Sequence, residues 1–291
     1  MIAALVRSGV VGDNKDSATV VPWWSFTKTV IAAAALALVR DGLVELDEFI
    51  PGQRYTLRQL LRHQAGLTDY GQLPDYHLAV SRGDEPWPEK EMLARADVNA
   101  LRYPPGKGWN YSNIGYLFVR HVIEEATGSN FDVALKTLVL HPLEANETRL
   151  ACSREDLAIV QTSEVVGYDP RWVYHGLLIG PLCEAGLLLH RLMTGSFLSP
   201  DLISAMRERF HLGGSQPGRP WDSIGYGLGL MIGTVNGKTV TGHSGVGPGS
   251  TIAVYHASGS PHSLTGAVFN LGADEGAGEL EVLRMLDLPR S

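Results

Sequence analysis

The stretch that decides the fold is Ser25-Phe26-Thr27-Lys28, followed by an Ala-rich and almost unbroken apolar run at Val30–Val39. The pattern predicts a helix from Ser25 to about Arg40, and Gly42 is a favourable stop signal just beyond it. A helix that is apolar on every side is buried on every side. We therefore expect this helix at the centre of the fold, with Ser25 at its N-terminal end.

Ser25 and Lys28 are three residues apart, so on a helix they share one face and the lysine can lie beside the hydroxyl. A serine hydroxyl is a poor nucleophile at neutral pH and needs a base within hydrogen-bond reach. Lys28 can be that base only when neutral, and burial lowers a lysine pKa from its usual value of about 10.4. The helix N-terminus also stabilises negative charge at the serine. A capping serine followed by a helical lysine is the alternative interpretation of this pair alone.

Two further motifs follow this pair, and each occurs once in the chain. Tyr111-Ser112-Asn113 is the only Tyr-x-Asn, and His243-Ser244-Gly245 is the only Lys/His-Ser/Thr-Gly triplet. In this order, the three motifs resemble the set found in the serine β-lactamase and penicillin-binding-protein superfamily. Members with Tyr in the second motif are the class C β-lactamases, the D-alanyl-D-alanine carboxypeptidases and the related family VIII esterases.

The resemblance extends along nearly the whole chain, and the further segments that fit it are Tyr55–Leu67, Pro105-Gly106, Asn113–Tyr116 and Gly225–Gly229. It implies a β-lactamase/transpeptidase-like fold of the α/β (α+β) class. In that fold an antiparallel sheet is flanked by helices, and a mainly helical lobe is inserted. The site lies between the two lobes.

The order of predicted elements agrees with this division. Residues 1–24 and 221–291 hold the expected strands and form the sheet lobe, whereas residues 25–220 form a mainly helical lobe with the Ser25 helix at the seam. Predicted strands are a hairpin at Ile2–Val11, then Gly225–Val235, Lys238–His243, Thr251–Tyr255 and Leu264–Leu271. Asn236-Gly237 is a strong hairpin turn signal. The segment from Thr56 to about Leu212 is mostly helical, with one clear helix at Leu182–Thr194, and a last helix is expected at Glu279–Leu288.

The resemblance also implies a role for each motif residue. Ser25 is the nucleophile, while Lys28 and Tyr111 share the proton transfers. Asn113 orients Lys28 and a substrate carbonyl, and His243 and Gly245 contribute to substrate binding. The backbone N–H groups of Ser25 and Val246 match the oxyanion hole, where one donor is worth roughly 2.7–4 kcal/mol.

Other motifs are excluded by their spacing. Gly242–Val246 resembles the start of a lipase elbow, but that fold needs an acid and then a histidine after the nucleophile. No Asp or Glu lies between Ser244 and His256 or His262, the histidines that follow it. Gly233–Thr239 imitates a phosphate loop with one residue too few, and a hairpin explains it better. The ten histidines form no metal-binding motif, so no metal or cofactor is expected.

Composition limits the partners. The formal net charge of −7 argues against nucleic acid or an anionic membrane, since both require a basic surface. Cys152 and Cys183 are predicted to be two buried free thiols. No run is long enough to span a membrane, and the N-terminal residues lack the layout of a signal peptide, which predicts a cytoplasmic protein. Relatives usually have a helix before the first strand, so either that element is absent or the true start lies upstream.

The third motif narrows the function. Class C lactamases carry Lys where this chain has His243, and a neutral imidazole is a weaker anchor for a carboxylate. We therefore expect a serine hydrolase that cleaves a small ester or amide through an acyl-serine. The alternatives are a D-alanyl-D-alanine carboxypeptidase or β-lactamase, and a non-catalytic ligand-binding relative. The partner is thus a small ester, amide or lactam, and the sequence leaves the acyl group, the leaving group and the oligomeric state open.

Overall fold

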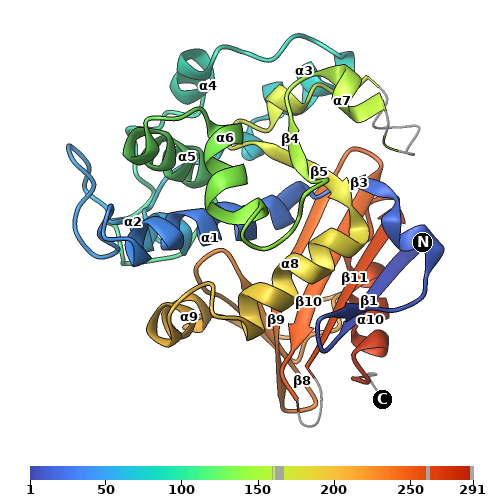
Figure 1. The fold of residues 1–291 in the computed structure, drawn as a ribbon. Coiled ribbons are helices and arrows are strands. Elements are labelled where there is room, and N and C mark those ends of the chain that lie inside the picture. The colour runs from blue at the N-terminus through green and yellow to red at the C-terminus, as the bar shows by residue number, and fades with distance from the viewer. Residues whose placement is uncertain (159, 161–166, 260–262, 289–291) are drawn as a thin grey trace.

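The computed structural model describes residues 1–158, 160, 167–259 and 263–288. Within them, an eight-stranded antiparallel sheet has the order β2-β1-β11-β10-β9-β8-β7-β6 (Figure 1). Its strands are β1 (Ile2–Arg7), β2 (Val10–Val11), β6 (Phe210–Gly214), β7 (Ser223–Tyr226), β8 (Met231–Val235), β9 (Lys238–Gly247), β10 (Ser250–Ala257) and β11 (Leu264–Leu271). The N-terminal strand pairs with the last strand, with Ala4 opposite Ala267, so both ends of the chain build one sheet. This confirms the predicted α/β (α+β) class.

Helices α8 (Leu182–Thr194) and α10 (Glu275–Met285) cover the two faces of this sheet (Figure 1). Gly186 of α8 packs against Ala267, whereas Val282 of α10 packs against Gly266. Since neighbouring residues of a strand point to opposite faces, the two helices lie on opposite sides. The last helix begins four positions before the predicted Glu279, because Asp274 caps it by accepting from the Ala277 N–H.

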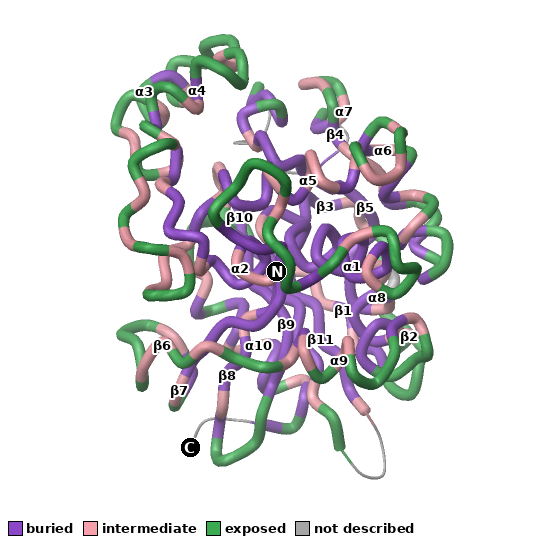
Figure 2. The backbone as a smooth tube through the Cα atoms, turned by 90° about the vertical axis from the view of Figure 1, so that its left-hand side faces the viewer, coloured by how far each residue is buried: buried purple, intermediate pink, exposed green. Residues whose placement is uncertain are grey.

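The central helix α1 (Thr27–Arg40) is buried on all sides, as expected from its composition. Figure 2 shows the buried backbone concentrated in this helix and in the neighbouring central strands. The predicted start at Ser25 is wrong, because Ser25 lies in a 3₁₀ turn at Trp24–Phe26 that leads into the helix. Trp24 has a φ of 36°, in the left-handed region that costs free energy for a residue with a β-carbon.

The segment between α1 and β6 is mainly helical, as predicted, but not throughout. Its helices are α2 (Leu57–Leu61), α3 (Pro74–Arg82), α4 (Glu89–Arg95), α5 (Asn113–Thr127), α6 (Phe131–Leu135), α7 (Arg154–Ala158), α8 and α9 (Pro200–Arg207). A second sheet has the order β3-β5-β4. Its strands β4 (Arg149–Ala151) and β5 (Leu177–Pro181) belong to this segment, whereas β3 (Val20–Pro22) comes before α1. Strands of three to five residues carry too little periodicity to be recognised in sequence.

Two further expectations need correction. Gly225–Val235 is not one strand, because the chain leaves the sheet between β7 and β8. A β-carbon on Gly227 would lie 2.2 Å from the Met206 carbonyl oxygen, so the bend needs glycine. The thiols are free, but Cys152 is exposed and Cys183 is only partly covered. The Asn236-Gly237 turn is confirmed, with φ values of 50° and 74° that suit a tight hairpin.

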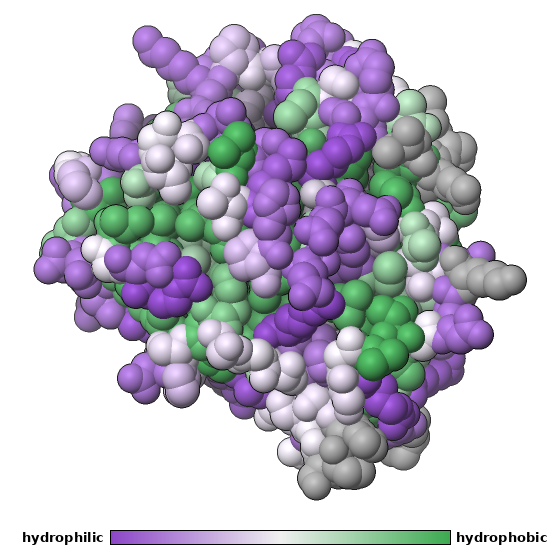
Figure 3. All heavy atoms as spheres, in the orientation of Figure 1, coloured by the Kyte–Doolittle hydropathy of each residue, from purple (hydrophilic) through white to green (hydrophobic). Residues whose placement is uncertain are grey.

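Hydrophilic residues cover much of the face in Figure 3, and hydrophobic residues appear there in separate areas. None of the helices in the described ranges is both long enough and apolar enough to cross a bilayer.

Candidate active site

Ser25 is held between the two sheets. On one side, the Trp23 N–H donates to the Leu178 carbonyl of β5 at 2.8 Å, and the Leu178 N–H donates to Thr27 Oγ1 at 3.1 Å. On the other side, Gly245 of β9 approaches the turn directly, since a β-carbon there would lie 2.5 Å from the Ser25 nitrogen. The turn that carries the candidate nucleophile is therefore held by contacts with both sheets.

The structure brings three predicted side chains together. The Tyr111 hydroxyl donates to Ser25 Oγ at 3.0 Å, and Lys28 Nζ lies 3.4 Å from the same oxygen. The lysine is completely buried, one turn after Ser25 as the spacing requires. Tyr111 comes from the loop just before α5, far away in the sequence.

The protonation of these groups follows from their burial. Burial lowers the pKa of Lys28 to about 7, against a weaker opposing effect of the Asp69 carboxylate. The same burial raises the pKa of Tyr111 well above its usual value, so this phenol keeps its proton at neutral pH. Near pH 7, therefore, the amine can accept a proton from the serine, while the phenol can only donate.

Asn113 is the first residue of α5 and is bonded to Asp69. Its Nδ2 donates to Asp69 Oδ2 at 3.2 Å, and its backbone N–H donates to Asp69 Oδ1 at 2.8 Å. Within the described ranges, the hydrogen-bond partners of Lys28 Nζ are Ser25 Oγ and His175 Nε2, at 3.4 and 3.0 Å. No hydrogen bond between Asn113 and Lys28 is found in the described part of the chain, and His175 is a partner of the amine that the motifs did not predict.

His243 lies on β9 and is almost completely buried. Its Nδ1 contacts the Ser244 carbonyl oxygen, which can only accept, so the ring hydrogen is on Nδ1. Nε2 then accepts from the Tyr226 hydroxyl at 2.9 Å. Burial lowers the pKa of His243 to about 3, which leaves the ring neutral at neutral pH. For a substrate to form a hydrogen bond with the His243 ring, one of these two hydrogen bonds must first break.

Two cavities meet at Ser25, Tyr111 and Val246. One, of about 650 Å³, extends along β7 to β9 and is also lined by His243, Arg219 and Glu275. The other, of about 550 Å³, extends toward α3 and α5 and is also lined by Trp24, Asn113 and His175. Trp24 therefore faces a cavity, whereas its neighbour Trp23 is buried in the core. An acyl group and a leaving group can each occupy one side of the serine.

A charged cluster forms part of the wall of the larger cavity, where Arg219 and Glu275 line it. Arg219 forms ion pairs with Glu275, at 3.1 Å, and with the fully buried Glu279. Glu279 also accepts from Trp221 Nε1 at 3.0 Å and from Ser244 Oγ at 2.5 Å, next to His243. The guanidinium is thus already shared by two carboxylates.

Sequence reasoning missed three buried residues around this centre. Asp69 accepts hydrogen bonds from Asn113, and His175 contacts Lys28. The third is His63, whose ring centre lies 4.3 Å from the ring centre of Tyr111. Only His63 falls in a segment that the resemblance covers. No group of three or more His, Cys, Asp or Glu side chains in the described part of the chain is arranged to hold a metal ion.

Known proteins similar to this chain include a D-aminopeptidase and a penicillin-binding protein. The chain is 26% identical over 276 residues to a D-aminopeptidase of Cereibacter sphaeroides, covering 88% of this chain and 51% of that protein. It is 30% identical over 138 residues to penicillin-binding protein 4* of Bacillus subtilis, covering 43% of this chain and 29% of that protein. The chain thus spans about half the length, or less, of these curated relatives.

Solved structures share the fold. A D-stereospecific amidohydrolase from Streptomyces sp. superposes with a TM-score of 0.78 at 24% identity, covering 96% of this chain and 92% of the other. The D-amino acid amidase from Ochrobactrum anthropi SV3 bound to D-phenylalanine gives 0.79 at 21% identity, covering 98% and 92%. The β-lactamase family model matches residues 8–271. With a match over nearly its whole length and the β-lactamase/transpeptidase-like fold, the chain belongs to the β-lactamase family of hydrolases.

Proposed function

We propose that the protein is a serine hydrolase that cleaves a small ester or amide through an acyl-serine on Ser25. The observation that carries the proposal is the convergence of Tyr111 OH and Lys28 Nζ on Ser25 Oγ, at 3.0 and 3.4 Å. An activated serine needs a base within this reach, and burial brings the pKa of Lys28 to about 7.

The proposed reaction has two balanced halves. As the bond from Ser25 Oγ to the acyl carbon forms, the hydroxyl proton passes to Lys28 Nζ. The bond to the leaving group breaks, and Tyr111 donates its proton to that group and is reprotonated from Lys28. Water then attacks the acyl carbon and gives one proton to the same amine. The bond from that carbon to Ser25 Oγ breaks, Lys28 returns the proton to Oγ, and the carboxylic acid leaves with Ser25 and Lys28 restored. The Ser25 and Val246 N–H groups are the proposed donors to the oxyanion.

Charge on the wall of the larger cavity favours substrates that present no carboxylate to Arg219 and Glu275. Arg219 is already ion-paired with Glu275 and Glu279, and Glu275 lines the cavity itself. His243 is neutral, with both ring nitrogens bonded within the protein. Among the described lining residues, Glu275 adds a negative charge beside the paired Arg219, so this wall disfavours a substrate carboxylate and tolerates a neutral group or an amine. The D-amino acid amidase bound to L-phenylalanine amide, among the structural neighbours, is in line with small amino-acid amides as substrates.

The alternative is a D-alanyl-D-alanine carboxypeptidase or β-lactamase, whose substrates carry the carboxylate that this wall disfavours. A non-catalytic ligand-binding relative is a further alternative, and the convergence on Ser25 argues against it.

The test combines labelling with a substrate panel. A fluorophosphonate should add one adduct per chain, on Ser25, as located by intact mass and peptide mapping. Ser25→Ala should abolish the adduct, whereas the exposed Ser81→Ala should retain it. The panel contains p-nitrophenyl esters, amino-acid amides, nitrocefin and a D-alanyl-D-alanine peptide. Faster turnover of nitrocefin or of the peptide than of every ester and amide would replace the proposal by the alternative.

A further inference from the structure

His175 is a buried histidine in direct contact with the candidate base. Its Nε2 lies 3.0 Å from Lys28 Nζ, and its side chain is 2% exposed. Burial lowers the pKa of His175 well below its usual value, and the neighbouring Lys28 lowers it further, so the ring is neutral at neutral pH. Nδ1 has no hydrogen-bond partner among the described residues. The contact with Lys28 is therefore the polar contact that the ring makes in the described part of the chain.

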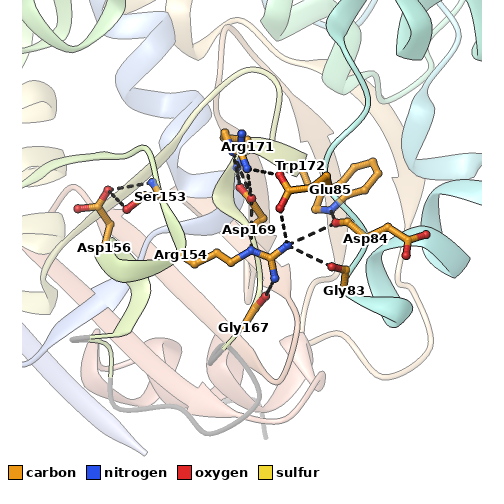
Figure 4. A network of polar contacts seen from close by, with 10 residues as sticks. All are labelled: Gly83, Asp84, Glu85, Ser153, Arg154, Asp156, Gly167, Asp169, Arg171 and Trp172. Carbon is orange, nitrogen blue, oxygen red and sulfur yellow. Dashed lines mark hydrogen bonds and ion pairs between the residues drawn. The ribbon is translucent and has the colours of Figure 1, made fainter.

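Ion pairs and hydrogen bonds connect the segment that carries His175 to the residues that follow α3. Asp169 is buried and forms ion pairs with Arg171 at 2.5 Å and with Arg154 at 3.5 Å (Figure 4). Arg154 also donates to the Gly167 and Gly83 carbonyl oxygens, and Trp172 Nε1 donates to the Asp84 carbonyl oxygen (Figure 4). These contacts join the segment before His175 to the end of α3.

The strand that follows His175 pairs with the strand that leads to the candidate nucleophile. Gly176 has a φ of 100°, and a β-carbon there would lie 3.0 Å from Leu150 and from Phe131, so this turn into β5 requires glycine. β5 pairs with β3, where Pro22 lies opposite Ile179, and β3 leads into the turn that holds Ser25. One small sheet therefore fixes both His175 and Ser25, on either side of Lys28.

We propose that His175 is the positioning residue for Lys28: its Nε2 accepts a hydrogen bond from the amine and thereby directs the amine lone pair toward Ser25 Oγ. This inference rests on the proposed function. A neutral amine has two hydrogens and one lone pair, so a hydrogen given to His175 leaves the lone pair for Ser25. Once Lys28 takes the serine proton it has no lone pair, and the ring nitrogen facing it can only accept. His175 thus stabilises the ammonium that acylation produces.

Other groups also act on the Lys28 amine, and a test must separate them from His175. Asp69 raises the pKa of Lys28 through its charge. The amine lies 5.0 and 5.7 Å from the ring centres of Tyr111 and Tyr116. Among the described residues, further titratable groups that interact with Lys28 or His175 are His63, His243 and Arg120. Substitutions confined to position 175 leave all of these unchanged.

Two substitutions of similar chemistry differ only in reach. His175→Gln places an amide oxygen near the position of Nε2 and keeps an acceptor for Lys28, whereas His175→Asn is one methylene shorter and cannot reach it. Loss of the acceptor removes a stabilising partner of the ammonium, which lowers the pKa of Lys28. A hydrogen bond to a charged group corresponds to about one pH unit or more.

In His175→Asn, the acid limb of the kcat/KM profile should shift to a pH about one unit lower, and the plateau value of kcat/KM should fall at least about tenfold. In His175→Gln, the acid limb should stay at the wild-type pH, and most of the plateau value of kcat/KM should be retained. His190→Asn is the matched control, because His190 is also buried but is bonded to Thr265, away from the site. Melting temperatures establish that each variant is folded. An unmoved limb in His175→Asn, or equal effects of Asn and Gln, would overturn the inference.

A second readout does not depend on activity. The ¹³Cε resonance of Lys28 can be titrated in each variant, and His175→Asn should lower its midpoint while His175→Gln and His190→Asn should not. If the midpoint moves but fluorophosphonate does not label Ser25, the hydrogen bond between Lys28 and His175 is supported and the proposed function is contradicted. If Ser25 is labelled and the midpoint is the same in all variants, the proposed function stands and the role of His175 falls.

Discussion

Gly245 and Ser25 are in such close contact that a β-carbon on the glycine would lie 2.5 Å from the Ser25 nitrogen and 2.7 Å from Trp24 Cβ. The third motif and the first motif thus meet through their backbones. The two N–H groups proposed for the oxyanion hole, at Ser25 and Val246, lie on the two segments in contact. Their separation depends on the absence of a side chain at position 245.

Gly245→Ala should therefore push the Ser25 turn away from β9. We expect kcat to fall by about 10²–10³, the usual effect of losing one oxyanion donor, with a stability loss of about 1–3 kcal/mol from overpacking. Gly214→Ala on β6 is the control, since the nearest atom to its new β-carbon would be the Asp222 carbonyl oxygen at 3.8 Å. Ester hydrolysis and urea unfolding measure both effects. Similar results for the two variants would contradict the proposed role of this contact.

The pH dependence should be set by Lys28. With a pKa of about 7 in the folded enzyme, the amine is neutral above pH 7, so kcat/KM for an uncharged ester should rise through pH 7 and then level off. Burial keeps the Tyr111 pKa well above its usual value and holds that of His243 at about 3, so neither limits the rate between pH 5 and 10. Lys28→Arg, which cannot lose its proton, should be inactive throughout. An acid limb below pH 5 would assign the base to another group.

Tyr111→Phe should remove a proton donor without disturbing the fold. The hydroxyl donates to Ser25 Oγ at 3.0 Å, while its ring packs 4.3 Å from that of His63 and remains in the variant. We expect kcat to fall by about 10²–10⁴, the range for general acid–base catalysis, with little change in KM. Tyr103→Phe loses a hydroxyl bonded to the His63 carbonyl oxygen at 3.1 Å and serves as the control. Equal losses in both variants would indicate a structural role for Tyr111.

Long elements with clear periodicity could be predicted from the sequence, and short ones could not. The apolar run of α1, the full span of α8 and the Asn236-Gly237 hairpin have strong local signals. The strands β3, β4 and β5 are short, and they form because distant segments pair beside Ser25, which is not a local property. The same applies to the 3₁₀ turn at Ser25, where contacts from β5 and β9 override helix propensity.

The candidate site shows a similar limit. Ser25, Lys28, Tyr111 and His243 belong to short motifs that can be recognised, and the fold brings them together from distant parts of the chain. His175 and Asp69 have no motif, because their importance comes from burial next to Lys28. The hydrogen bonds from Asn113 to Asp69 and between Lys28 and His175 likewise join residues that are distant in the sequence, so only the folded chain contains them.

The last prediction concerns the stability cost of burying Lys28. Its pKa falls from 10.5 to about 7 on folding, so between these values the unfolded chain binds more protons and stability must rise with pH. Below pH 7 the full penalty is present, and above 10.5 it is gone. Within this window, each tenfold change in proton concentration changes the free energy of unfolding by about 1.4 kcal/mol, so from pH 7 to 9 the wild type should gain about 2 kcal/mol relative to Lys28→Met.

Urea unfolding at both pH values measures this difference, and Lys238→Met, at an exposed lysine, should show the same change with pH as the wild type. Parallel curves for wild type and Lys28→Met would mean that the amine keeps its ordinary pKa in the folded protein, and Lys28 would then be too basic to act as the proposed base at neutral pH.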